Sequence, residues 1–92
     1  MTNRIEAQIY GKVQGVSFRH YTQKKASHLN LTGWVANVSD GSVRVVAEGE
    51  EDKLKQLIIF LHIGSPFAQV DQVDVSWTPA TGHFHQFSVR WQ

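Results

Sequence analysis

Apolar and polar residues alternate along several stretches of the chain, which is the pattern of strands that bury one face of a sheet. The first stretch sets Ile5, Ala7 and Ile9 against polar neighbours. A β-rich run follows later, and three further stretches repeat the period of two. The predicted strands are residues 4–10, 32–38, 43–48, 73–77 and 87–91, with Gly49 ending the third and a loop at 79–82 following the fourth.

A helix is predicted from about Phe18 to Asn30, because apolar residues recur there at near-helical spacing with lysines on the other side. Ser17 precedes the first turn, and its hydroxyl is suited to accept a hydrogen bond from an early helical N–H group. Asn30 is a suitable C-terminal residue. The helix therefore carries both a start and a stop signal.

A second helix is predicted between an acidic start and a glycine stop. Acidic residues at 50–52 stand where the helix dipole favours negative charge. The apolar stripe at positions i, i+3, i+4 and i+7 consists of Leu54, Leu57, Ile58 and Leu61. Gly64 is a C-terminal stop, and Pro66 forbids continuation.

The element order is β-α-β-β-α-β with a short fifth strand, which matches an α+β, ferredoxin-like split βαβ sandwich. We expect one domain over residues 1–92, with two helices on one face of a mostly antiparallel sheet. The first crossover makes strands one and two parallel, and strand three lies between them. Their ends therefore meet at one edge of the sheet, which brings Asn37 toward residues 14–19.

The composition narrows the classes of partner. The net charge of +1 gives no electrostatic case for nucleic acid or for a membrane surface. Cysteine is absent, which excludes disulfides and thiolate chemistry and suits a reducing cytoplasm. The N-terminal residues 1–11 have no signal-peptide core, and the apolar run 57–61 is too short to span a bilayer.

A glycine-containing loop that ends in an arginine joins the first predicted strand to the first predicted helix. Glycine permits backbone angles with φ > 0 and close approach of another group. The first N–H groups of a helix lack partners within it, and together with a guanidinium they suit a phosphate or a carboxylate. This predicted anion-binding loop comprises Gln14, Gly15, Val16, Ser17, Phe18 and Arg19.

Two residues stand where their chemistry is locally unfavourable. Arg19 is a cation in a first helical turn, where the dipole disfavours positive charge. It is either a solvent-exposed charge or, as we favour, a guanidinium that binds two phosphate oxygens. Asn37 lies in a predicted strand, which disfavours asparagine. Alone it would be a polar residue on an exposed sheet face. Beside the anion-binding loop, its amide suits holding a water or a substrate oxygen.

Other candidates for chemistry are weaker. His83 and His85 share one face if the segment is extended, but a metal site needs a third ligand, so exposed loop histidines are the preferred interpretation. Ser17 has no identifiable His–Asp relay, which argues against a serine hydrolase. The acidic residues show no paired acid and base. We expect no metal and no cofactor.

Two segments resemble the signatures of the acylphosphatase family. Residues 11–19, Gly-Lys-Val-Gln-Gly-Val-Ser-Phe-Arg, match its G-x-V-Q-G-V-x-F-R pattern, and residues 33–43 are similar to its G-(F/Y/W)-V-x-N-x-x-D-G-x-V pattern. Residues 87–90, Phe-Ser-Val-Arg, resemble its terminal F-x-(I/V)-R. The resemblance covers essentially the whole chain. One departure lies at residues 64–68, where family members often have Gly-Pro.

The resemblance implies an enzyme that hydrolyses acyl phosphates to a carboxylate and inorganic phosphate without a metal. It implies that Arg19 and the loop N–H groups bind the phosphate, and that Asn37 orients the attacking water. Since a carboxylate is already a good leaving group, the site needs only to neutralise charge, hold the phosphoryl group in line and aim a water. We expect a cytoplasmic monomer whose ligands are a small acyl phosphate and inorganic phosphate, with no nucleic-acid or membrane partner.

A non-catalytic phosphate-binding or RNA-binding module on the same fold is the alternative. RNA-binding sheets of this topology use exposed aromatic residues on the two central strands and a basic surface. Tyr10 is the lone aromatic residue of the first predicted strand, and the third has none. This weighs against RNA, and a turnover assay separates a regulatory binder from an enzyme.

Overall fold

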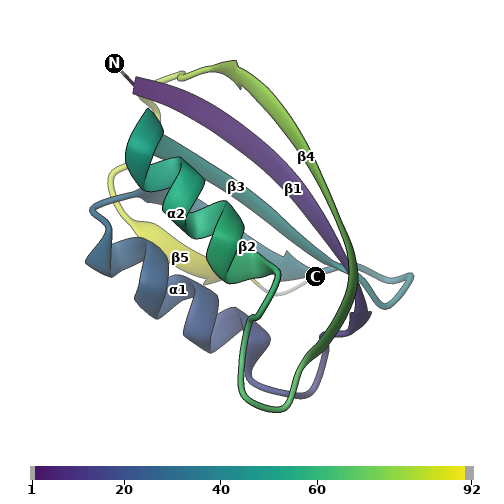
Figure 1. Ribbon diagram of the computed structural model, residues 1–92. Coiled ribbons are helices and arrows are strands. Elements are labelled where there is room, and N and C mark those ends of the chain that lie inside the picture. The colour runs from purple at the N-terminus through teal and green to yellow at the C-terminus, as the bar shows by residue number, and fades with distance from the viewer. Residues whose placement is uncertain (1, 91–92) are drawn as a thin grey trace.

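Two helices cover one face of a five-stranded sheet in the computed structural model (Figure 1), which describes residues 2–90. The elements in chain order are β1 (Thr2–Lys12), α1 (Phe18–His28), β2 (Thr32–Asn37), β3 (Val43–Glu50), α2 (Glu51–Leu61), β4 (Gln69–Pro79) and β5 (Phe87–Arg90). The predicted α+β, ferredoxin-like sandwich is therefore confirmed, including the placement of both helices on one face.

The strand order β4-β1-β3-β2-β5 puts the site-bearing strands beside the centre of the sheet. β3 is antiparallel to both β1 and β2, so β1 and β2 run parallel with β3 between them, as predicted. Val43 of β3 lies opposite Ile9 on one side and Asn37 on the other. At about 4.8 Å per strand, Asn37 is therefore roughly 10 Å across the sheet from Ile9, near the end of β1.

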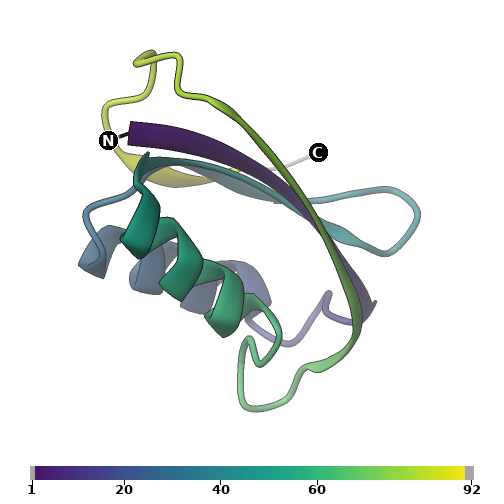
Figure 2. The ribbon, with the colours of Figure 1, turned by 45° about the horizontal axis from the view of Figure 1, so that its top comes forward.

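The core lies between the helices and the concave face of the sheet, which curves over them in Figure 2. Alternate residues of the central strands point into it, while α1 and α2 contribute one apolar face each. Its fully buried members include Ile5, Ile9, Val43, Val45, Leu54, Leu57, Leu61 and Phe18. This packing holds the first turn of α1, and with it the anion-binding loop, against the sheet.

The helix ends differ from the sequence prediction by one or two residues. α1 ends at His28 rather than near Asn30, because Asn30 adopts a left-handed conformation with φ 60°. The N–H groups of Asn30 and Leu31 donate to the carbonyls of Ser27 and Ala26, which closes the helix as a Schellman motif.

The second helix begins one residue later than predicted and ends at Leu61, three residues before the predicted glycine stop. β3 runs through Gly49 to Glu50, so Gly49 does not end the strand and α2 begins at Glu51. Gly64, with φ 68°, donates its N–H to the Phe60 carbonyl at 2.8 Å and terminates this segment. The glycine provides the left-handed conformation that the turn requires.

Several strand ends also differ from the sequence prediction. β2 ends at Asn37 rather than at residue 38, and β4 is longer than predicted because it pairs with β1 along its length. Pro79, expected in a loop, is its last residue. The predicted last strand extended to Trp91, which lies outside the described residues.

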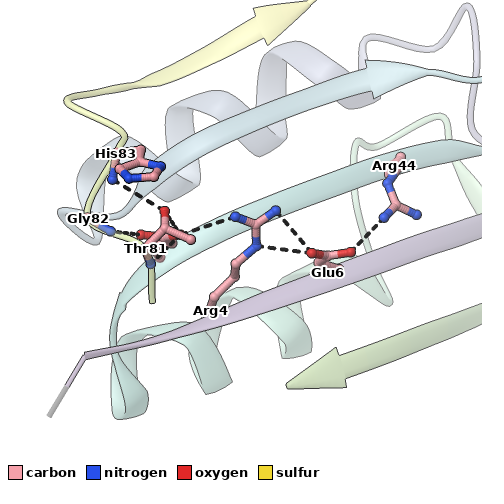
Figure 3. Close-up of polar contacts among 7 residues, drawn as sticks. Arg4, Glu6, Arg44, Thr81, Gly82 and His83 are labelled. Atoms are coloured by element: carbon pink, nitrogen blue, oxygen red, sulfur yellow. Dashed lines mark hydrogen bonds and ion pairs between the residues drawn. The ribbon is translucent and has the colours of Figure 1, made fainter. Parts of the chain in front are cut away.

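The face of the sheet opposite the helices carries a polar network (Figure 3). Its ion pairs are Arg4–Glu6, Arg4–Glu48 and Arg44–Glu6. Glu48, only 4 % exposed, accepts hydrogen bonds from the N–H groups of Thr81 and Gly82 and from the Thr81 hydroxyl. Burial alone would raise the pKa of the Glu48 carboxyl, but these hydrogen bonds and the one from Arg4 outweigh it and hold that pKa below its usual value. Glu48 thereby anchors the connection between β4 and β5 to the sheet.

Candidate active site

The anion-binding loop has two residues in the left-handed conformation, with one residue between them. Gly15 has φ 73°, which glycine adopts without strain, and Ser17 has φ 62° and ψ 21°. The Ser17 hydroxyl makes no capping hydrogen bond, so the predicted side-chain N-cap is wrong. The reason is backbone geometry, because a capping serine normally has extended rather than left-handed angles.

Unpaired backbone donors are concentrated in this loop. Within residues 2–90, the N–H groups of Gly15, Val16, Ser17 and Phe18 donate no hydrogen bond to the protein. Where residues in the left-handed conformation occur in a loop, successive backbone N–H groups can point toward a common centre. They then form a concave anion-binding site, called a nest. The N-terminal end of the α1 dipole adds positive potential at the same place. The loop therefore has both the donors and the potential that an anion requires.

A cavity of about 430 Å³ opens beside the loop, a volume within the range of small-molecule sites. Its lining residues are Val13, Gly15, Ser17, Phe18, Arg19, His20, Asn37 and Val89. Five of the seven predicted site residues thus line one cavity, and none of its eight lining residues is acidic. Of the remaining two, Val16 is partly buried against the core, and Gln14 lines a neighbouring cavity that Asn37 also lines.

Arg19 projects from the first turn of α1 toward β5. Its Nη1 donates a hydrogen bond to the Arg90 carbonyl at 3.2 Å, which places the guanidinium between the helix and the last strand. A guanidinium has five N–H donors. Such a side chain in the cavity lining can engage more than one acceptor at once.

Asn37 is the last residue of β2, and its amide is a polar group without visible structural use. Its Oδ1 is buried and has no hydrogen-bond partner among the described residues. An unsatisfied buried acceptor costs about 1–3 kcal/mol. Since such groups are rare in native proteins and call for an explanation, the position favours a role in binding a water or a ligand.

Gln14 has a different environment from the other predicted site residues. Its Nε2 donates to the carbonyl of Val38 at 2.7 Å and to that of Ser42 at 2.8 Å. The side chain therefore ties the anion-binding loop to the turn between β2 and β3. Because both N–H donors of the side-chain amide are used there, that amide has none left for an anionic ligand.

Two other groups of residues at this site were not predicted from the sequence. Ser65, which is 2 % exposed, donates a hydrogen bond from its hydroxyl to the Val16 carbonyl. The only sequence signal was the departure from the family pattern at residues 64–68. Val13 and Val89 belong to the segments that resemble the family signatures, but only the fold places them in the cavity wall, together with His20 of α1.

The structure groups no other ligating side chains. Among residues 2–90, no three His, Cys, Asp or Glu side chains are placed to hold a metal ion. His83 and His85 are both exposed in the connection before β5. None of the described helices has the length and apolarity needed to cross a membrane.

Comparisons with known proteins point to one family. A family model described as acylphosphatase matches residues 5–89. A curated acylphosphatase from Salinibacter ruber is 51 % identical over 87 residues, covering 95 % of this chain and 92 % of the relative. The crystal structure of acylphosphatase from Bacillus subtilis superposes with a TM-score of 0.93 at 36 % identity, covering 98 % of this chain and 99 % of that one.

A second solved structure gives the same result. The structure of an acylphosphatase from Coxiella burnetii has a TM-score of 0.91 at 42 % identity and covers 97 % of this chain and 93 % of its own. The chain therefore belongs to the acylphosphatase family and is an enzyme that hydrolyses acyl phosphates.

Proposed function

We propose that the N–H groups of the anion-binding loop and the guanidinium of Arg19 hold the phosphoryl group of the substrate, and that Asn37 positions the attacking water. The observation that carries the proposal is the set of unpaired N–H groups at residues 15–18 beside a cavity that Arg19 and Asn37 also line. Backbone donors already oriented toward an anion lower the barrier because they need no rearrangement during the reaction.

In the proposed reaction the water oxygen forms a bond to phosphorus while the bond between phosphorus and the acyl oxygen breaks. The carboxylate leaves with the bonding pair, so no strong general acid is needed. The proton of the water passes directly to a phosphate oxygen, so this reaction requires no side-chain base. The products are a carboxylate and inorganic phosphate.

The two side chains have different roles in this scheme. Arg19 neutralises phosphoryl charge in the bound substrate and in the transition state, so it contributes to affinity as well as to rate. Asn37 is uncharged, and its amide offers a donor and an acceptor to a water molecule. Its contribution is therefore greatest in the transition state, when the water must be in line with the breaking bond.

Thermal unfolding with inorganic phosphate tests the proposal. Phosphate at a hundredfold excess over its dissociation constant should stabilise the wild type by about 2.7 kcal/mol, which for a domain of this size raises Tm by roughly 10 °C or more. Arg19→Ala should lose most of this increase. Arg44→Ala is a matched control, because Arg44 lies on the opposite face of the sheet and pairs with Glu6.

The same three proteins are assayed for hydrolysis of benzoyl phosphate. We expect the wild type and Arg44→Ala to be active and inhibited by phosphate, and Arg19→Ala to be nearly inactive. If phosphate does not stabilise the wild type, or stabilises Arg19→Ala equally, the anion-binding loop is not the phosphate site.

A further inference from the structure

Ser65, in the connection between α2 and β4, makes a long-range contact with the anion-binding loop. Its side chain is 2 % exposed, and its hydroxyl donates a hydrogen bond to the Val16 carbonyl, 49 residues away in the sequence. Neither residue is in a helix or a strand, so regular secondary structure does not explain the contact. The bond joins the loop to the connection that follows α2.

The planarity of the peptide unit gives this bond a consequence at the site. The Val16 carbonyl and the Ser17 N–H belong to one trans peptide, in which the C=O and N–H bonds point in opposite directions. A hydroxyl that holds the carbonyl on one side therefore directs the N–H to the other side. Ser17 lines the cavity, and its N–H donates to no described group.

We propose that Ser65 is a positioning residue, which holds the Val16–Ser17 peptide so that the Ser17 N–H points at the phosphoryl group of the substrate. The inference rests on the proposed function, since it assigns a cause to the orientation of one phosphate-binding donor. Ser65 touches neither substrate nor water and acts only through the peptide unit that it holds.

The backbone of Ser17 needs such an external constraint. It is left-handed at a residue other than glycine, a conformation that persists only where the surroundings impose it. Gly64 supports the adjacent residue: a Cβ atom built on it would lie 2.2 Å from Cε2 of Phe18, whose side chain is 1 % exposed. The consecutive residues Gly64 and Ser65 therefore support the loop on both sides of Ser17, Gly64 by close packing on Phe18 and Ser65 by its hydrogen bond to Val16.

The test compares Ser65→Ala and Ser65→Thr with the wild type. Thr22→Val is the matched control, because Thr22 is another fully buried hydroxyl, but one with no hydrogen-bond partner within residues 2–90. Inorganic phosphate is titrated into ¹⁵N-labelled protein while the amide resonances of residues 15–19 are followed. The values of kcat and KM for benzoyl phosphate and the melting temperature are measured on the same samples.

We expect Ser65→Ala to weaken phosphate binding and raise KM by about threefold to tenfold, the effect of losing one net hydrogen bond. The phosphate-dependent shift of the Ser17 amide should shrink more than those of its neighbours, and kcat should fall less than kcat/KM. Ser65→Thr retains the hydroxyl and should bind phosphate as the wild type does. Thr22→Val should leave phosphate binding and the Ser17 response unchanged.

Two results would overturn the inference, and they have different meanings. If Ser65→Ala binds phosphate with wild-type affinity and an unchanged Ser17 shift, whatever its melting temperature, the serine only stabilises the fold. If phosphate shifts no amide of residues 15–19 in the wild type, the proposed function itself fails, and the role of Ser65 fails with it.

Discussion

Replacing Asn37 by alanine should separate catalysis from stability, because the side chain makes no hydrogen bond that the fold needs. Its buried Oδ1 is without a partner among the described residues. Removing such an acceptor recovers part of a desolvation cost of about 1–3 kcal/mol, which offsets the packing lost with the side chain. We therefore expect the free energy of unfolding to change by less than about 1 kcal/mol, within the range of unexceptional substitutions.

Catalysis should respond far more strongly to the same change. The loss of one preorganised polar group that acts in the transition state lowers kcat by about 10²–10³, which is roughly 2.7–4 kcal/mol of barrier. KM and the phosphate inhibition constant should stay near their wild-type values, since the phosphoryl group is held by other residues. The loss of activity would then be larger than partial unfolding of the variant can explain.

Benzoyl phosphate hydrolysis, phosphate inhibition and thermal unfolding of one preparation provide the three measurements. Asn37→Asp is an informative companion, because it keeps the size of the side chain but places a negative charge at the cavity wall. We expect it to weaken phosphate binding through repulsion, which alanine does not. If phosphate affinity of Asn37→Ala falls in step with kcat, Asn37 is a binding residue and does not position the water.

Three further predictions concern charge. Arg19→Lys should be nearly as inactive as Arg19→Ala, because lysine keeps the charge but loses the planar pair of donors; kinetics of both variants check this, and a lysine variant close to wild type would mean that charge alone suffices. Hydrolysis should continue in excess chelator, and activity that disappears with chelator and returns with one divalent ion would refute the proposed metal-free reaction. The Glu48 pKa is lowered in the folded protein, so its carboxylate stabilises the fold above the unfolded pKa of about 4.3, and this contribution is lost as the pH falls through the folded pKa. Glu48→Gln should therefore lower the free energy of unfolding by about 1.5–3 kcal/mol at pH 7 and by much less at pH 3. Denaturant unfolding that gives equal losses of stability at the two pH values would contradict this prediction.

Much of the fold could be predicted from the sequence because it depends on local periodicity. The alternation of Ile5, Ala7 and Ile9 identifies a strand with one buried face, and the spacing of the α2 stripe identifies a helix. The element order then fixes the relation of β1 to β2 through the split βαβ unit. This was enough to predict that Asn37 approaches the anion-binding loop.

The details of the loop could not be predicted because they depend on distant partners. A serine before a helix normally suggests a side-chain N-cap, and no local signal predicts the left-handed backbone of Ser17. Gln14 reaches a carbonyl 24 residues away, and Ser65 reaches one 49 residues away. Both contacts exist only once the sheet and α2 have brought these segments together.

The strand order also bears on how the enzyme acquires its activity during folding. β1 must pair with β4 from the other end of the chain, and the guanidinium of Arg19 is held by a carbonyl of β5. Such distant pairings close large loops, and proteins that depend on them fold in milliseconds to seconds rather than microseconds. The proposed site depends on these distant pairings, so a chain with helices already formed but its outer strands undocked would have no competent site.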